Sequence, residues 1–447
     1  MERITDQDKL TTLLEPAQLI IIGAIVAIFV ISFRGKGETT LYCVVIAMAT
    51  CVVTALSYGT GFIATFETIF SIVNVKPLIV LLCFGIIINV VEQQTIFEYF
   101  AIRIIRMTKD NVRLLFYLIC LLAAFFSCFL EDVSVAMIFI PLIIRTAQLL
   151  VIDAVPFITG IAYSIIAGNL LTAFASPSNI LIAELLNVDT TWFFTTFFWL
   201  FILIIGVSLV LLDLRQVRRL TVPDPTRVTV LIEIFDSKTL IASPRKFAIN
   251  LAFLIGTFVA VILIPTHVAP LYLVLIIAVL VICGSQSESI GKHLKKADWN
   301  LVLFILSIFL ISACLSVSSL LAELTLLFSN ALGDNVILSV IVITITCSLI
   351  GSFFSKSAAI IIFSTIVTQL PIYAAYKDVL VMAVVIGTII AGNIVPQSAS
   401  HLLKTLSITR ERHVDKVSQK MLIKNSVAFT MISLVTGILY TLTFLLF

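Results

Sequence analysis

The sequence predicts an all-α polytopic membrane protein built from two inverted five-span repeats, each with a re-entrant hairpin and a broken helix. Three observations lead to this prediction. Hydrophobic residues make up 60% of the 447 residues and charged residues only 12%, a balance typical of chains that cross a bilayer several times. Long apolar segments recur along the chain. Polar motifs inside these segments occur twice, at one constant separation.

The duplication is visible in short polar motifs set in apolar surroundings. Residues 129–135 read FLEDVSV, and residues 353–359 read FFSKSAA. Two further motifs, Ala-Gly-Asn and Ala-Ser, also occur once in each half. Because a single separation of 224 residues relates all of these motifs, the halves are predicted to be an internal repeat. The correspondence pairs residues 129–135 with 353–359, 167–169 with 391–393, and 175–176 with 399–400.

The first repeat is predicted over residues 17–212, after a polar N-terminal segment at 1–16 without a signal-peptide pattern. Its apolar stretches are near the ~20 residues that cross a bilayer. Residues 96–107 instead interleave apolar side chains with Arg103 and Arg106, which is typical of a helix lying in the membrane interface. The five predicted spans cover residues 17–33, 40–57, 77–91, 156–186 and 192–212.

A re-entrant hairpin is predicted at 112–146, with two half-length apolar arms that meet at Glu131 and Asp132. Ionisable groups at that depth cost at least ~2.5 kcal/mol each, so they usually face a cavity and have a function. Irregular backbone is tolerated there only beside protein or water. The span at 156–186 is broken by Gly168 and Pro177 among Asn and Ser residues, which is typical of a transporter binding site.

A polar linker at residues 213–246 separates the repeats and contains a β-branched run at 228–235 with the composition of a short strand. The second repeat, residues 247–447, follows the same plan, with a hairpin at 335–371 and a broken span near 379–403. Its other elements are predicted at 247–264, 271–283, 301–317, 320–332 (interfacial) and 425–447.

An odd number of spans per repeat inverts the second copy relative to the first. When the loops are assigned to alternating sides, one side receives 23 of the 28 basic residues, and the positive-inside rule makes that side cytoplasmic. The linker is then cytoplasmic and both termini are extracytoplasmic. The first hairpin enters from the cytoplasm and the second from outside. The basic residues not on the cytoplasmic side are Arg3, Lys9, Lys76, Lys377 and the buried Lys356.

Positions 132 and 356 correspond under the repeat, so an inverted-repeat fold places their backbones across a pseudo-two-fold axis near the midplane. The hypothesis is a charge pair between Asp132 (or Glu131) and Lys356 that trades protons as substrate arrives. In the alternative, these charges only pin the two hairpins together. The cost of purely structural charge at this depth favours the functional interpretation.

Further candidates lie at the hairpin tips and helix breaks. Asn169 and Asn393 either line a cavity or cap the broken helices. His401 is either a member of a proton relay with Asp132 and Lys356, or a packed core histidine. The predicted substrate- or ion-binding residues are Glu131, Asp132, Ser134, Asn169, Ser176, Ser178, Asn179, Ser355, Lys356, Ser357, Asn393, Gln397, Ser398 and Ser400.

Three segments resemble the ion transporter superfamily: residues 96–103 (IFEYFAIR), residues 129–134 (FLEDVS) running to Pro141, and residues 175–182 (ASPSNILI). They are most similar to its arsenite-permease, P-protein and sodium/proton-antiporter branch, with its citrate-transporter-like domain. The resemblance implies a scaffold part, a moving transport part, an elevator-like motion and a homodimer.

The chain departs from that branch at the site itself. Glu131-Asp132 stands where the branch has Asp-Asn, and Ser176 stands where it has Asp. Lys356 stands at the second tip, where relatives that couple to sodium have Asn or Asp-Asn. A lysine at this position would occupy or repel the sodium ion.

These features predict a secondary transporter of a small anion or ion, coupled to protons or sodium, rather than an enzyme. A sodium/proton antiporter, an arsenite-type efflux permease, a channel and a non-transporting membrane scaffold remain alternatives. No Walker motif or metal-ligand spacing is present, and no cofactor is predicted beyond the coupling ion. The eight cysteines lie singly in apolar segments, as free thiols do. The expected partners are the bilayer and the substrate, and no nucleic acid.

Overall fold

The computed structural model describes residues 16–34, 39–58, 61–92, 95–108, 111–220, 226, 244–264, 268–285, 291, 294–295, 297, 299–318, 320–353, 356–395, 398–414 and 416–445. These residues form helices joined by short loops and turns, and none of them is assigned to a strand. Eight of the described helices are long and apolar enough to cross a membrane. The chain is therefore an all-α, multi-pass integral membrane protein. The strand predicted at 228–235 lies outside the described residues.

The chain divides into two compact units. In the first unit, α2 packs against α1, α3 and α15, and α15 also contacts α16. The amide of Gln18 donates to the backbone oxygen of Ser318 at 3.3 Å, which joins α1 to the end of α15. The helices of this unit are α1 (Pro16–Arg34), α2 (Thr39–Ser57), α3 (Phe62–Ile72), α15 (Trp299–Val317) and α16 (Leu320–Leu332).

The second unit contains both hairpins and both broken helices. From the first half of the chain it includes α4 (Lys76–Glu92), α5 (Ile96–Thr108), α6 (Val112–Ser127), α7 (Asp132–Leu150), α8 (Val155–Gly168), α9 (Pro177–Leu186), α10 (Thr190–Arg215) and the 3-10 turn η1 (Val217–Arg219). From the second half it includes α12 (Pro244–Leu263), α13 (Leu271–Ser285), α17 (Val336–Phe353), α18 (Lys356–Gln369), α19 (Tyr373–Val385), the π-helical turn η2 (Ile386–Ile390), α20 (Ser400–Glu411) and α21 (Gln419–Thr443).

Most predicted helices are present, and several differ from the prediction in extent. Helix α3 was not predicted, because Glu67 interrupts its short apolar stretch. The arms α7 and α17 have 19 and 18 residues, so the prediction of half-length hairpin arms is wrong for these two. Helix α10 continues to Arg215, into the predicted linker, and α21 begins at Gln419, before the predicted span.

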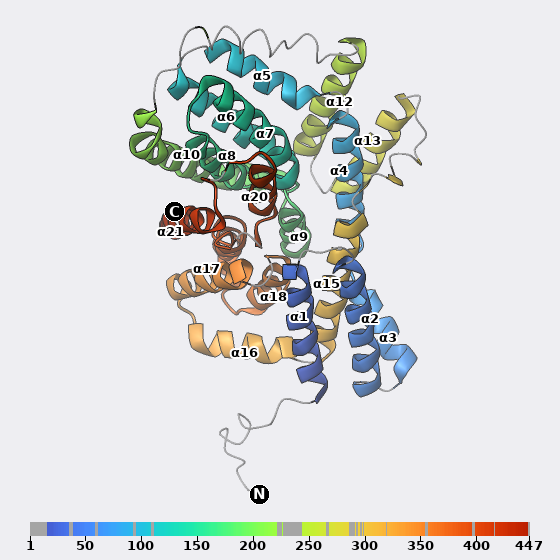
Figure 1. The fold of residues 1–447 in the computed structure, drawn as a ribbon. Coiled ribbons are helices and arrows are strands. Elements are labelled where there is room, and N and C mark those ends of the chain that lie inside the picture. The colour runs from blue at the N-terminus through green and yellow to red at the C-terminus, as the bar shows by residue number, and fades with distance from the viewer. Residues whose placement is uncertain are drawn as a thin grey trace, which may run out of the picture. The chain divides into compact units, whose positions relative to one another are not determined.

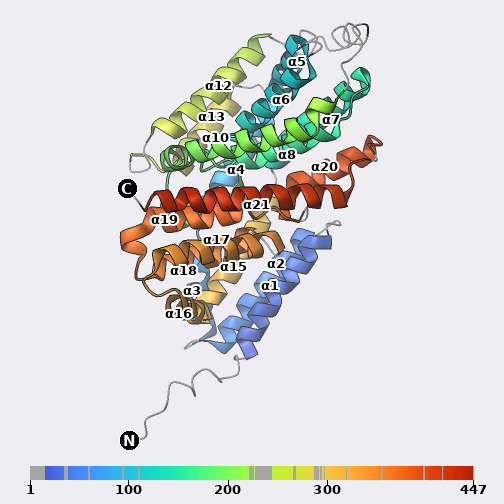
Figure 2. The ribbon, with the colours of Figure 1, turned by 90° about the vertical axis from the view of Figure 1, so that its left-hand side faces the viewer.

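The helix packing in the second unit follows the duplication. Helix α9, the second part of the first broken helix, packs against α18 of the other repeat. In the same way α20 packs against α7, so each broken helix reaches across to the hairpin of the other half (Figure 1). Helix α21 lies between α10 on one side and α17 on the other (Figure 2). A two-fold relation between the repeats predicts this exchange, while the opposite membrane orientation of the repeats stays a prediction.

Polar contacts away from the hairpin tips also hold helices of the second unit together. Arg113 at the start of α6 donates through Nε to Oδ1 of the buried Asp213 at 3.0 Å, which fastens the base of the first hairpin to α10. Lys416 forms an ion pair with Asp153 at 2.9 Å. The indole nitrogen of Trp192 donates to Asp378 at 2.9 Å. The last two contacts connect the first repeat to the second.

The first hairpin and the first broken helix meet at Gly168, where α6 and α8 pack closely. A Cβ at this position would overlap the carbonyl oxygen of Ala124 and lie 2.9 Å from the Cβ of Ser127. We expect Gly168→Ala to destabilise the protein by about 1–3 kcal/mol, because α6 and α8 must move apart to accommodate the added methyl group. The midpoint of thermal unfolding of the purified protein in detergent measures this effect.

Gly206→Ala in α10 is the matched control, because nothing lies within 4 Å of a Cβ there. Alanine is favoured over glycine inside a helix by about 1 kcal/mol, so this variant should unfold at the same or a higher temperature. Equal midpoints for the two variants would contradict the close packing at Gly168.

Candidate functional site

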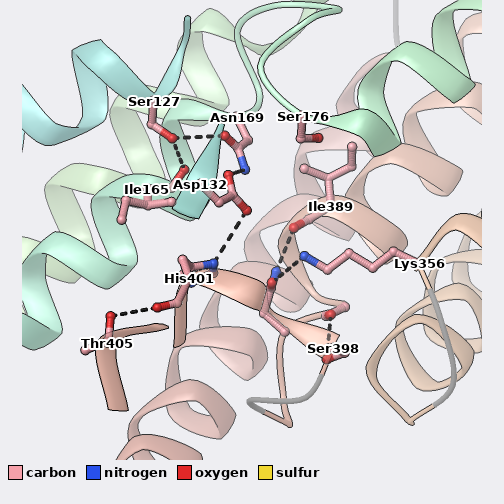
Figure 3. Close-up of polar contacts among 12 residues, drawn as sticks. Ser127, Asp132, Ile165, Asn169, Ser176, Lys356, Ile389, Ser398, His401 and Thr405 are labelled. Carbon is pink, nitrogen blue, oxygen red and sulfur yellow. Dashed lines mark hydrogen bonds and ion pairs between the residues drawn. The ribbon is translucent and has the colours of Figure 1, made fainter. Parts of the chain in front are cut away.

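The tip of the first hairpin places Asp132 at the first position of α7, where the chain turns back after α6. Its Oδ1 accepts a hydrogen bond of 2.6 Å from Nδ2 of Asn169, at the break between α8 and α9. The hydroxyl of Ser127 lies 2.9 Å from Oδ1 of Asn169 and 2.8 Å from the backbone oxygen of Ile165. Ser127 therefore orients the amide that holds the carboxylate (Figure 3).

The tip of the second hairpin has the corresponding arrangement with the opposite charge. Lys356 is the first residue of α18, and its ammonium donates to Oδ1 of Asn393 at 2.6 Å. Nδ2 of Asn393 donates to the backbone oxygens of Ile389 and Ile390 at 2.7 and 2.8 Å, which the helix break leaves without helical partners. Asn393 therefore caps the broken helix and also orients the lysine, while the lining of a cavity by Asn169 and Asn393 stays a prediction.

The two charged residues face the same space from opposite sides without touching (Figure 3). Among the described residues, Lys356 and Asp132 do not lie within ion-pair distance, since each is bonded to the asparagine of its own repeat. The direct Asp132–Lys356 charge pair hypothesised from the sequence is therefore not formed in this state, and the alternative with Glu131 stays a prediction. Their interaction is through space, which leaves one carboxylate and one ammonium facing a shared site.

His401, at the second position of α20, provides the contact between the two halves of the site. Its Nδ1 lies 3.5 Å from Oδ2 of Asp132, and its side chain is fully buried. Neither ring nitrogen has a hydrogen-bond partner in the described structure. The backbone oxygen of His401 accepts from the hydroxyl of Thr405 at 2.7 Å, as is common for Thr inside a helix.

Four helices begin at or beside this site. Helices α7 and α18 start with the charged residues themselves, α20 starts at Ser400, and α9 starts at Pro177. Helix N-termini carry partial positive charge and free backbone N–H groups. These N-termini and the ammonium of Lys356 attract an anion, whereas the carboxylate of Asp132 repels one.

The first helix break is braced by residues that the sequence placed in the site. Nδ2 of the buried Asn179 donates to the backbone oxygens of Asn169 and Thr172. The hydroxyl of Ser176 caps α9 by accepting from the backbone N–H of Asn179 at 3.3 Å. These hydrogen bonds hold the loop between α8 and α9 in one conformation. They also fix the position of the backbone carbonyl of Asn169.

The remaining predicted residues lie near the site in different ways. Ser398 donates to the backbone oxygens of Gly392 and Val395 and so closes the second break. Ser134, Ser178 and Ser357 are buried in the first turns of α7, α9 and α18, and Glu131 is half-buried. Ser400 is exposed. Ser355 and Gln397 lie outside the described residues.

Sequence reasoning missed the supporting hydroxyls. Ser127 orients Asn169, and Thr172 donates to the backbone oxygen of Cys128 at the hairpin tip. In the second half, Ser348 and Ser352 both donate to the backbone oxygen of Ala391, at 3.0 and 3.2 Å. A serine in an apolar arm is a weak signal. Its position within one or two turns of a predicted tip could have identified it.

The fold is that of a polytopic membrane protein, and sequence comparison assigns the family. The family described as "Citrate transporter" (CitMHS) matches residues 26–389. This match covers most of the chain, so the protein belongs to the citrate transporter family, within the ion transporter superfamily indicated by the hairpin motifs.

Individual relatives agree with this assignment. A 46 kDa membrane protein of Mycobacterium leprae is 23% identical over 370 residues, which is 82% of this chain and 85% of the relative. A protein of Synechocystis sp. named as an uncharacterized transporter is 26% identical over 276 residues, 61% of each chain. The P protein of Mus musculus is 28% identical over 105 residues, 23% of this chain and 13% of the relative. The chain is a membrane transporter.

Proposed function

We propose that this protein is a secondary active transporter of a small carboxylate anion, driven by a proton or sodium gradient through alternating access. Its family is described by the transport of citrate, a carboxylate, and the charge distribution at the hairpin tips suits a substrate of that kind. The elevator-like motion and the homodimer implied by the resemblance belong to the same proposal, as does the orientation with both termini outside.

The observation that carries this proposal is the convergence of Lys356 with four helix N-termini. The ammonium donates to Asn393 and retains two further N–H groups, which suit carboxylate oxygens. Helix N-termini attract anions independently of side chains. Asn169 and Asn393 add fixed amide dipoles on either side of the space between the tips.

The sodium/proton antiporter is the second candidate, because the carboxylate of Asp132 faces the imidazole of His401 at 3.5 Å in the same site. An arsenite permease is less well supported. Arsenite is often bound through thiols, and Sγ of Cys128 donates to the backbone oxygen of Ala124 at 3.3 Å, within its own helix. The eight cysteines are all buried thiols outside disulfides, and the described residues include no cluster with metal-ligand character.

The decisive experiment uses the purified protein in liposomes on a solid-supported membrane. Citrate, shorter dicarboxylates, monocarboxylates and inorganic anions are applied in turn, each with an imposed proton or sodium gradient. A saturable current that requires one class of carboxylate and is absent from protein-free liposomes is the expected result. Currents that respond to cation gradients but not to any anion would instead establish the antiporter.

A further inference from the structure

We propose that α5 and α12 together form a binding site for the headgroup of an anionic phospholipid of the bilayer. The basic residues of this headgroup site are Arg103 on α5 and Arg245 and Lys246 on α12. Helix α5 comes from the first half of the chain and α12 from the second, and both belong to the second unit. The site is separate from the hairpin tips and does not depend on which substrate the protein carries.

Helix α5 has the side-chain distribution of a helix that lies in the membrane interface. It has 13 residues, fewer than the ~20 that cross a bilayer. Its exposed residues include Arg103, while an apolar face is turned inward. A basic amphipathic helix of this kind places its cations among the lipid headgroups. The buried apolar residues of α5 are Ile96, Phe97, Ala101, Ile102 and Ile105.

Helix α12 brings two further basic residues to α5. It has 20 residues and is apolar enough to cross the membrane, so its first turn lies near the membrane surface. Arg245 and Lys246 are exposed in this first turn. The next residue, Phe247, packs edge-on against Tyr99 of α5, with ring centroids 5.3 Å apart. The basic start of α12 therefore lies beside α5 (Figure 1).

Tyr99 also positions the guanidinium of Arg103. Nη1 of Arg103 donates to the hydroxyl of Tyr99 at 3.0 Å, so one tyrosine connects the arginine to the first turn of α12. A guanidinium has five N–H donors, and those not bonded to Tyr99 suit phosphate oxygens. Basic residues outnumber acidic ones on the two helices, where Glu98 is the sole carboxylate. The headgroup site therefore has a net positive charge.

The face of α12 below the basic residues favours a lipid over a soluble phosphate ester. Exposed apolar residues follow Arg245 at intervals of three and four, so they continue the same side of the helix. An amphiphile can place its phosphate at the basic residues and an acyl chain along this face, whereas a soluble ester covers only the first part. The exposed apolar residues are Ala248, Ile249, Ala252, Ile255 and Val259.

A lipid held at this site would act on the first hairpin. Helix α5 precedes the hairpin in the chain and packs against both of its arms, α6 and α7. A ligand that binds the folded state stabilises it by mass action. Each lysine or arginine near an anionic membrane surface strengthens attachment about fivefold. Anionic lipid should therefore stabilise the protein, and the size of the effect should depend on these basic residues.

The test measures the midpoint of thermal unfolding of the purified protein in detergent micelles with increasing mole fractions of phosphatidylglycerol. We expect a saturable rise for wild type, and no rise with phosphatidylcholine. The triple variant Arg103→Gln/Arg245→Gln/Lys246→Gln should require at least about 30-fold more phosphatidylglycerol for half of the rise. Tyr99→Phe keeps the ring contact but loses the hydroxyl that holds Arg103, so a smaller shift of about threefold is expected.

The matched control is the triple variant Arg410→Gln/Arg412→Gln/Lys420→Gln, which removes the same residue types at exposed positions. It should keep the wild-type dependence on phosphatidylglycerol, and an equal loss in this control would overturn the inference. An equal rise with phosphatidylcholine, or with glycerol 3-phosphate alone, would also overturn it.

A further variant retains the positive charge of the headgroup site. Arg103→Lys/Arg245→Lys should still bind phosphatidylglycerol, which separates loss of charge from misfolding. Loss of binding in this variant, with an unchanged midpoint in lipid-free detergent, would contradict a site that depends on positive charge.

Discussion

Replacing Lys356 with glutamine is expected to abolish the carboxylate-dependent current, or to raise the apparent KM for the anion by at least about 100-fold. Loss of one partner from a buried, charge-assisted contact costs about 2–5 kcal/mol. Glutamine retains a hydrogen-bonding terminus for Asn393, so the hairpin tip keeps its contact while the positive charge is lost. Concentration series of the active carboxylate on the solid-supported membrane give both KM and maximal current.

The same substitution at an exposed lysine distinguishes the loss of charge at the site from a general effect of replacing any lysine with glutamine. Lys420→Gln, at the start of α21, is exposed and should leave both parameters unchanged. Lys356→Arg keeps the positive charge but replaces the compact ammonium with a larger, planar guanidinium, so partial activity is expected. A Lys356→Gln protein with wild-type KM and current would show that the anion binds elsewhere.

Replacing Asp132 with asparagine is expected to abolish gradient-driven accumulation of the anion. The amide can still accept from Asn169, which preserves the tip, but it no longer offers a carboxylate to His401 or an opposing charge to Lys356. Without that negative charge, the positive field at the site is uncompensated. The anion should therefore bind more tightly and leave more slowly.

Uptake and binding of the radiolabelled anion distinguish the effect on accumulation from the effect on affinity. With Asp132→Asn, we expect accumulation against a gradient to fall to the level of protein-free liposomes, while equilibrium binding strengthens by about tenfold, equivalent to about 1.4 kcal/mol. Asp334→Asn, at an exposed position before α17, is the control and should behave as wild type. Unchanged accumulation by Asp132→Asn would remove this carboxylate from the transport cycle.

A double-mutant cycle of Asp132→Asn and Lys356→Gln would test whether the two charges act on each other without direct contact. Residues that share one site show coupling energies of about 0.5–3 kcal/mol. Independent sites would instead give additive changes in binding free energy.

The sequence by itself determined the fold class and predicted the duplication and the candidate site. Apolar length specifies helices in a bilayer because backbone groups there must be satisfied within the segment, and the apolar stretches coincide with most of the spans. The motif separation of 224 residues matched Asp132 with Lys356 and Asn169 with Asn393, and these same pairs form the two halves of the site. A charged residue in the hydrocarbon region is so costly that it strongly indicates a functional site.

Only the tertiary structure decided which of these groups contact one another. The sequence hypothesis joined Asp132 to Lys356, whereas each is bonded to an asparagine of its own repeat and His401 faces Asp132 from the other half. The reason is geometric. A charged side chain at a helix N-terminus bonds to the polar groups that the neighbouring helix break presents at hydrogen-bond distance. Which groups these are depends on how α20 packs against α7, and helix packing of that kind leaves no motif in the sequence.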